Sequence, residues 1–272
     1  MKIKFLIKKL FNKVFNTFTK AFPFSRYRTR YFNRFFLNKE KVSIIDIGSY
    51  GGYLDFWKEK DINYKLSFDP IEKRKSSKKN LIFNCALWNK DSEINIYFTK
   101  GGGSDSLEHN FDYLLSKTKS LASRVNPKLL NSFLENAKII RQEVHQARSL
   151  DSILEDINID FDFIKIDVQG AEKKILQGAE KYLDSGKCLG LLIETYTIRM
   201  FEEQSLYGEI SILLRKYNYI PVLQYPSHGS FGCSNDTLFI KTGIRNAKLN
   251  TILKTYNLLR WSDGYYEQEL ND

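Results

Sequence analysis

Three aspartates stand at the ends of short apolar runs, where side chains of a parallel sheet can meet a ligand. Asp46 closes the run VSIID, Asp69 follows YKLSF, and Asp167 follows FDFIKI. In an open parallel sheet, ligands bind outside the carboxyl ends of the strands. We therefore expect the three carboxylates to lie along one edge of a sheet and to face a common site.

The turn after the first run reads D-I-G-S-Y-G-G and contains Asp46, Gly48 and Gly52. Glycine lets a ligand approach the backbone closely, and the N–H groups that follow are free to bind it. The spacing is not the G-x-G-x-x-G of dinucleotide sites, and the leading acid favours a cation over a pyrophosphate. S-adenosylmethionine has a cation and no phosphate, so it is the expected ligand. The alternative is a tight strand-to-helix turn that binds nothing.

Asp69 ends the second run and is followed by Pro70. A carboxylate at this place can accept hydrogen bonds from both hydroxyls of a ribose. An aspartate before proline is also typical of a helix cap. The glycine turn upstream favours the ribose interpretation.

The third run places Lys165 among apolar neighbours. By period two its side chain faces the same side as Asp167, and a buried lysine needs a partner. Asp167 could supply one, and so could Glu194 at the end of the next apolar run. A carboxylate beside an acceptor hydroxyl can orient it or take its proton, which makes Asp167, Glu194 and Lys165 the catalytic candidates. The alternative is a structural ion pair.

The histidines and cysteines give weaker signals. His109, His145 and His228 have no carboxylate or cysteine at a metal-ligand spacing, so we expect no metal site. His228 lies in the loop PSHGS and is a reserve candidate for a base. The three cysteines are odd in number and form no CxxC pair, which favours a reducing, cytoplasmic compartment.

The rest of the chain alternates strands with helices, which is typical of an α/β fold with a parallel sheet. We expect strands over residues 42–47, 64–68, 81–83, 161–166, 190–195, 219–225 and 236–241, a hairpin over 86–99, and an edge strand over 138–145. We expect helices over residues 52–60, 170–183, 202–217 and 245–261, a short helix capped by Ser149, and a helical insertion over 109–135. With 42% hydrophobic residues in 272, the chain can build a sizeable core.

The N-terminal segment differs from the rest in charge. Residues 1–41 hold twelve of the 42 basic residues and one of the 32 acidic ones, and the remainder is nearly neutral. The spacing over residues 2–22 predicts a basic amphipathic helix, which can lie on an anionic membrane or pack on the domain. No run reaches the ~20 apolar residues of a membrane span. We therefore divide the chain into an arm, residues 1–41, and a domain, residues 42–272.

Residues 26–36 of this arm interleave arginines with aromatic side chains, a mixture that can bind single-stranded nucleic acid. The nearly neutral domain has no matching basic surplus, so a nucleic-acid partner is disfavoured.

Residues 162–183 (DFIKIDVQGAEKKILQGAEKYL) and 193–225 (IETYTIRMFEEQSLYGEISILLRKYNYIPVLQY) resemble the signature of the FkbM family of S-adenosylmethionine-dependent methyltransferases. The motifs IIDIGSYGG, SFDP, NCALWN and SLDSIL also fall where that family has its own. The resemblance covers roughly residues 42–241 and leaves out the arm. It implies a seven-stranded, mostly parallel class I methyltransferase sheet with helices on both faces.

The resemblance also implies roles for individual residues. Asp46, Gly48 and Gly52 would form the loop on the methionine side of the cofactor, and Asp69 would bind its ribose. Asn84 and Ala86 would lie near the adenine. Asp167, Glu172 and Glu194 would border the acceptor. The sequence departs from the family at Gln169, where a glutamate is usual, and at residues 49–51, where Ser-Tyr-Gly replaces Ala-Asn-x.

These features together predict an S-adenosylmethionine-dependent O-methyltransferase that acts on a hydroxyl of a sugar, a glycan or a related small molecule. We expect it in the cytoplasm, with peripheral contact to the inner face of the membrane through residues 2–22. Two alternatives stay open: an RNA methyltransferase guided by the basic aromatic arm, and a non-catalytic module that docks at a membrane.

Overall fold

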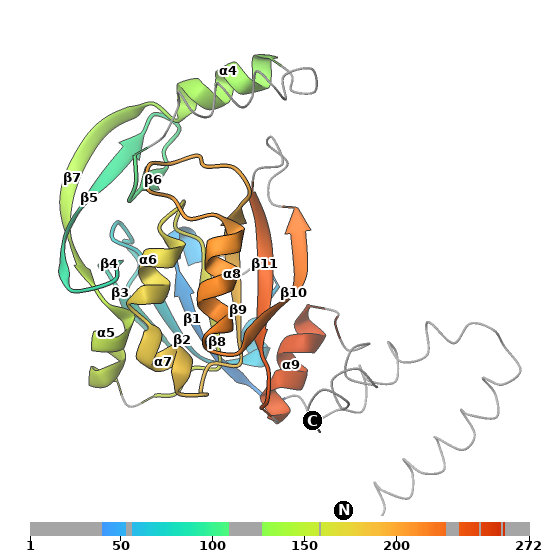
Figure 1. Ribbon diagram of the computed structural model, residues 1–272. Helices are drawn as coiled ribbons and strands as arrows, with labels where there is room; N and C mark the ends of the chain where they lie inside the picture. The colour runs from blue at the N-terminus through green and yellow to red at the C-terminus, as the bar shows by residue number, and fades with distance from the viewer. Residues whose placement is uncertain are drawn as a thin grey trace, which may run out of the picture.

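The computed structural model describes residues 40–52, 56–108, 127–157, 159–226, 234–244, 246–256 and 258. Within them the chain forms a seven-stranded sheet and a four-stranded sheet (Figure 1). Almost all of the predicted arm, including its helix over residues 2–22, lies outside the described residues, as do His109 and His228.

The large sheet is mostly parallel. Its strands are β1 (Val42–Ile47), β2 (Ile62–Phe68), β3 (Asn80–Phe83), β8 (Phe163–Ile166), β9 (Gly190–Tyr196), β10 (Tyr219–Pro226) and β11 (Ser234–Lys241). They lie in the order β10-β11-β9-β8-β1-β2-β3, and β11 runs antiparallel to both of its neighbours. The predicted fold class and the strands predicted for this sheet are therefore confirmed.

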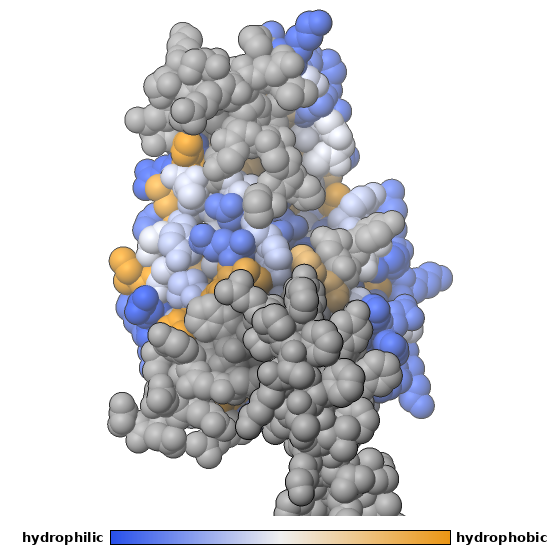
Figure 2. Space-filling view, turned by 90° about the vertical axis from the view of Figure 1, so that its right-hand side faces the viewer, coloured by the Kyte–Doolittle hydropathy of each residue, from blue (hydrophilic) through white to orange (hydrophobic). Residues whose placement is uncertain are grey.

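Helices cover both faces of this sheet, and the burial of its central strands explains the apolar runs in the sequence. All six residues of β1 and all seven of β9 are buried, as expected for strands that are covered on both faces. One face packs against α5 (Leu150–Asp156), α6 (Glu172–Gln177), α7 (Glu180–Asp184) and α8 (Tyr207–Arg215), and the other against α9 (Ala247–Thr255). In Figure 2, the coloured part of the surface on the side of β10 carries only small apolar patches between polar residues.

The small sheet corrects two predictions. Its strands β4 (Ala86–Leu87), β5 (Ser92–Thr99), β6 (Ser104–Asp105) and β7 (Ile139–Arg148) lie in the order β4-β7-β5-β6. The predicted hairpin over residues 86–99 is wrong, because β7 lies between β4 and β5 and Ala147 pairs with both Ala86 and Ser92. The predicted edge strand is thus an interior strand. Most of its side chains are exposed or half-buried, so its composition resembles that of an edge.

The predicted helices over residues 170–183 and 202–217 are present but divided or shorter, whereas the described part of the one predicted over residues 52–60 forms no continuous helix. Over residues 52–60, the described part has 3-10 turns at Tyr50–Gly52 and Glu59–Asp61, and residues 56–58 are not helical. The predicted helix over residues 170–183 is divided into α6 and α7 at Gly178, where a Cβ atom would lie 2.1 Å from the carbonyl oxygen of Trp88. The helix predicted from residue 202 begins only at Tyr207.

Two further helices match their predictions in part. Helix α9 is shorter at both ends than predicted, and α4 (Pro127–Asn136) is the described part of the insertion. The cap at Ser149 is confirmed, because its side chain accepts a hydrogen bond from the N–H of Ser152.

Two strand-to-turn connections meet tightly at the carboxyl edge of the large sheet. Gly48 has φ +76°, and a Cβ atom there would lie 1.8 Å from the carbonyl oxygen of Asp167. In the second connection, the Glu172 side chain is fully buried, and its Oε1 accepts a hydrogen bond of 3.0 Å from the N–H of Gly170. Burial raises the pKa of Glu172 to about 8, so this carboxyl group is largely protonated at neutral pH.

Replacing Gly48 by alanine should lower the free energy of unfolding by more than the ~1 kcal/mol that a positive φ alone costs, because the new methyl group meets backbone that cannot turn away. Gly102→Ala is the matched control, because Gly102 has φ +88° but open space around its Cβ position. Urea unfolding of both variants measures the difference. If both variants lose the same free energy of unfolding, the close approach of the Asp167 carbonyl group to Gly48 does not contribute to the loss.

The buried carboxyl group of Glu172 should make stability depend on pH. Because its pKa is higher in the folded state than its ordinary 4.5, the folded state binds more protons between pH 4.5 and 8, and the free energy of unfolding should fall as the pH rises through this range. At about 1.4 kcal/mol per pKa unit, the fall is on the order of a few kcal/mol. Glu172→Gln cannot ionise and should lack it.

The measurement is urea unfolding of the wild type and Glu172→Gln at pH 5.5 and pH 8.5. The exposed Glu202→Gln serves as control and should keep the pH dependence of the wild type. If Glu172→Gln also loses stability as steeply as the wild type, Glu172 is not the group responsible.

Candidate functional site

A cavity of about 250 Å³ lies between the carboxyl edge of the large sheet and the small sheet. The large sheet and its connections contribute Ile47, Gly48, Tyr50, Phe68, Asp69, Pro70, Ile71, Asp167, Val168, Gln169 and Ile175. The small sheet and its loops contribute Ala86, Leu87, Ile96, Gly102, Gly103, Ser104 and Ser106. Four of the predicted site residues therefore line one cavity: Gly48, Asp69, Ala86 and Asp167.

The glycine turn is hydrogen-bonded to the end of β2. The N–H groups of Gly48 and Ser49 both donate to the carbonyl oxygen of Phe68, at 3.0 and 3.2 Å. Tyr50 follows, and its largely exposed side chain borders the cavity. Gly52 ends the turn and does not line the cavity.

Asp69 makes a cap-like hydrogen bond and also lines the cavity, so its ribose role stays a prediction. Its Oδ1 accepts a hydrogen bond from the N–H of Ile71 at 3.0 Å, as in a cap, although no helix follows. Its Oδ2 accepts one from the N–H of Tyr50 at 3.1 Å, and the side chain lines the cavity. Burial raises the pKa of Asp69 above its ordinary value. Each oxygen has a second lone pair, so the carboxylate can still accept a hydroxyl.

Asp46 lies beneath the turn and not in the cavity wall. Its carboxylate is fully buried and forms an ion pair of 2.7 Å with Lys65 of β2. On the other side, Nζ of Lys165 lies 4.0 Å from Asp46 and 3.3 Å from Asp167. Burial lowers the pKa of Lys165, but Asp167 and Asp46 raise it by more, so the lysine stays charged.

Lys165 thus meets Asp167 as predicted and Asp46 in addition. Its expected alternative partner, Glu194, instead belongs to a second group of polar side chains. Nε2 of Gln169 donates to Asp167 at 3.0 Å and to Glu194 at 3.1 Å, and the Tyr196 hydroxyl donates to Glu194 at 2.6 Å. Gln169 has φ +59°, an uncommon backbone conformation outside glycine. The sequence marked Gln169 as a departure but gave no sign that it joins the two carboxylates.

Of the two residues predicted to lie near the adenine, Ala86 lines the cavity and Asn84 does not. Ala86 lines the cavity on the side of the small sheet. Asn84 is exposed, and its side-chain amide donates to the carbonyl oxygen of Glu72, so its place near the adenine stays a prediction. His145, in β7, lies 3.3 Å from Glu143 and does not line the cavity. Among the described residues, no three His, Cys, Asp or Glu side chains group in a way that could hold a metal ion.

The described lining suits S-adenosylmethionine. It includes the carboxylates of Asp69 and Asp167 and contains no lysine, arginine or histidine, so it favours a cation over an anion. Gly48 brings the main chain to the wall of the cavity. Asp69 offers acceptors for a ribose, and small or apolar side chains such as Ala86 leave room for a flat ring.

The sequence matches the Methyltransferase FkbM domain over residues 46–221. No curated protein matches the chain. The solved structures that are similar to it include a methyltransferase FkbM from Methylobacillus flagellatus KT, with 13% identity and a TM-score of 0.41 over 79% of this chain and 47% of that one. The chain therefore spans about half the length of that structure. Another is the magnesium protoporphyrin IX methyltransferase of Synechocystis PCC 6803 with bound S-adenosylmethionine, with 10% identity and a TM-score of 0.36 over 75% of this chain and 72% of that one.

The family match extends over well over half of the chain, from Asp46 in β1 to Pro221 in β10. It contains every residue that lines the cavity. Among the described residues, no helix is long and apolar enough to cross a membrane. The chain belongs to the FkbM methyltransferase family.

Proposed function

We propose that this protein transfers a methyl group from S-adenosylmethionine to a hydroxyl oxygen of a sugar or a similar small, uncharged molecule. One observation carries the proposal. The carboxylate of Asp167 lies in the cavity wall beside the glycine turn, and the hydroxyl-bearing residues Ser104 and Ser106 line the same cavity from the small sheet. A hydroxyl acceptor placed among them would find hydrogen-bond partners around it.

The bound cofactor supplies a methyl group on a positively charged sulfur. The protein has to align the acceptor oxygen with that methyl group and remove the hydroxyl proton. We assign this second task to Asp167, whose carboxylate is held by Lys165 on one oxygen and by Gln169 on the other. The transfer forms a C–O bond, breaks the C–S bond, and leaves the proton on the carboxylate. We place Glu194 behind Asp167, because Gln169 donates hydrogen bonds to both carboxylates and so connects them.

The lining also supports an uncharged acceptor. A phosphate-bearing substrate such as RNA needs basic side chains, and the described lining residues include none. Hydroxyl, amide and carboxylate groups together with apolar side chains suit a molecule rich in hydroxyl groups. This favours a sugar over RNA.

The arm and the compartment complete the proposal. Cys85 and Cys188 are free thiols, which supports a reducing, cytoplasmic location. For the arm, residues 2–22 combine an apolar face with lysines, which supports contact with an anionic membrane.

Replacing Asp167 by asparagine should lower turnover by about a hundredfold or more, while the Kd for S-adenosylmethionine changes by no more than about threefold. The amide keeps the size of the side chain but cannot accept the proton. The measurement is formation of S-adenosylhomocysteine with a mixed pool of glycans as acceptors, together with calorimetry of cofactor binding. Asp160→Asn is the control, because Asp160 precedes the amino end of β8, whereas the cavity lies at the carboxyl edge of the sheet. Equal losses in turnover and affinity would contradict an acceptor-side role, and no product from any glycan would contradict the acceptor class.

Removing residues 1–40 should abolish sedimentation with vesicles that contain anionic lipid, because basic residues near such a surface contribute about 1 kcal/mol each. The full chain should sediment with these vesicles and not with neutral phosphatidylcholine vesicles. If the shortened chain sediments as well as the full one, the arm does not bind the membrane.

A further inference from the structure

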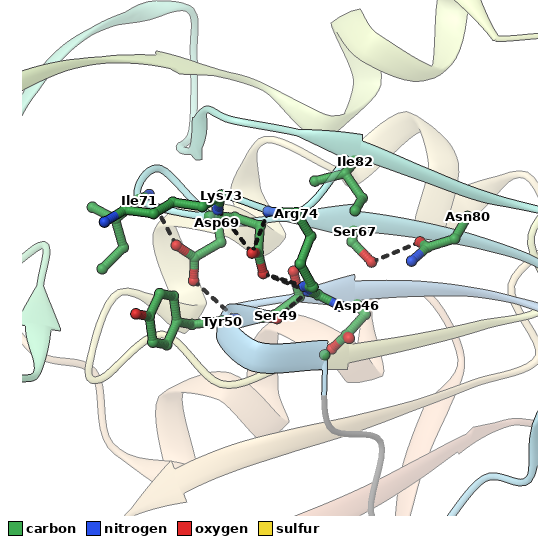
Figure 3. Close-up of polar contacts among 12 residues, drawn as sticks. Asp46, Ser49, Tyr50, Ser67, Asp69, Ile71, Lys73, Arg74, Asn80 and Ile82 are labelled. Carbon is green, nitrogen blue, oxygen red and sulfur yellow. Dashed lines mark hydrogen bonds and ion pairs between the residues drawn. The ribbon is translucent and has the colours of Figure 1, made fainter. Parts of the chain in front are cut away.

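The segment that follows β2 folds back onto the glycine turn and holds one of its peptide groups at both ends (Figure 3). The N–H of Tyr50 donates to Asp69, and the carbonyl oxygen of Ser49 accepts a hydrogen bond of 2.7 Å from Nη2 of Arg74. Both groups belong to the peptide unit between Ser49 and Tyr50. A carboxylate and a guanidinium from one short segment therefore fix the orientation of this unit.

The guanidinium of Arg74 is itself held in place by Glu72. Nε of Arg74 donates to Oε2 of Glu72 at 2.7 Å, and Nη2 lies 2.5 Å from the same oxygen. The other oxygen, Oε1, accepts hydrogen bonds of 2.8 Å from the N–H groups of Lys73 and Arg74. Hydrogen bonding to Arg74 lowers the pKa of Glu72 to about 2, so both charges persist at neutral pH.

Gly52 provides the space for this guanidinium. A Cβ atom at Gly52 would lie 1.9 Å from Nη1 of Arg74, and its φ of +80° also disfavours other residues. The arginine thus packs directly against the end of the turn. Lysine could not replace it, because a single ammonium group cannot bond to Glu72 and to the turn in the same fixed fork.

Arg74 does not line the cavity, whereas Gly48 and Tyr50 of the turn and Asp69 do. An effect of Arg74 on the cofactor would therefore pass through the turn. Without this contact, the turn would have to be ordered when the nucleoside binds, and that cost would weaken binding.

We propose that Arg74 is a positioning residue for the cofactor, which presets the peptide group between Ser49 and Tyr50 in the shape that the nucleoside binds. The inference rests on the proposed placement of the cofactor in this cavity. This role differs from a direct contact between Arg74 and the amino-acid end of the cofactor. A preset turn would strengthen the binding of every nucleoside that occupies the cavity, whether or not the nucleoside has that amino-acid end.

The test compares two ligands by calorimetry: S-adenosylhomocysteine and 5′-methylthioadenosine, which lacks the amino-acid carboxylate. Arg74→Met should weaken both by about the same factor, on the order of tenfold, which corresponds to one charge-assisted hydrogen bond. Arg74→Lys should restore little of the loss. Glu72→Gln, which loosens the hold on Arg74 without removing it, should weaken both ligands by a smaller factor.

Arg141→Met is the matched control. Arg141 also pairs with a glutamate two residues away, Glu143 at 2.5 Å, but lies on β7 and outside the cavity lining. This variant should bind both ligands as the wild type does. Thermal unfolding should shift little for Arg74→Met, while exchange of the Tyr50 amide hydrogen should become faster.

Three outcomes would overturn the inference. Unchanged affinity of Arg74→Met for both ligands would show that the turn does not need the contact. A loss confined to S-adenosylhomocysteine would assign Arg74 to the carboxylate of the ligand instead. If the wild type itself binds neither nucleoside, the proposed placement of the cofactor fails, and the inference fails with it.

Discussion

The buried carboxylate of Asp46 is the constraint on which the arrangement of the site depends. It is fully buried at the end of β1, between Lys65 of β2 and Lys165 of β8. A buried charge is tolerated only with partners, and removing one of them leaves an uncompensated charge. The three side chains therefore specify which strands lie beside β1 and in which register, since Asp46 is directly opposite Lys165 in the ladder.

The buried carboxylate of Asp46 also influences the residue that we assign to proton removal. Lys165 is shared between Asp46 and Asp167, so the carboxylate in the cavity is oriented by a cation that a deeper carboxylate holds in place. Above Asp46, the same strand continues into the glycine turn, which packs on the carbonyl group of Asp167. One charge cluster thus fixes both the turn proposed for the cofactor and the side chain proposed for the acceptor.

Sequence patterns predicted the large sheet because its signals are local. Runs of buried residues marked β1, β8 and β9, and period two correctly placed Lys165 beside Asp167. Lys65 was missed although it carries the same signal, a lysine in an apolar strand. The small sheet was missed for another reason: β7 lies between β4 and β5, although it begins 40 residues after the end of β5, and no local pattern encodes such a pairing. The contacts of Arg74 with the turn are equally non-local.

Gln169 illustrates how a departure from a family pattern can be read only with the geometry. Its amide donates to Asp167 and to Glu194, two carboxylates that both need donors. A glutamate in the same position would bring a third negative charge and could donate only when protonated. A glutamate at this position of the chain would therefore need a proton or a further cation to balance its charge. In this chain the neutral amide of Gln169 donates hydrogen bonds to both carboxylates. Lys165 therefore pairs with Asp46 and Asp167 and does not have to balance a further negative charge.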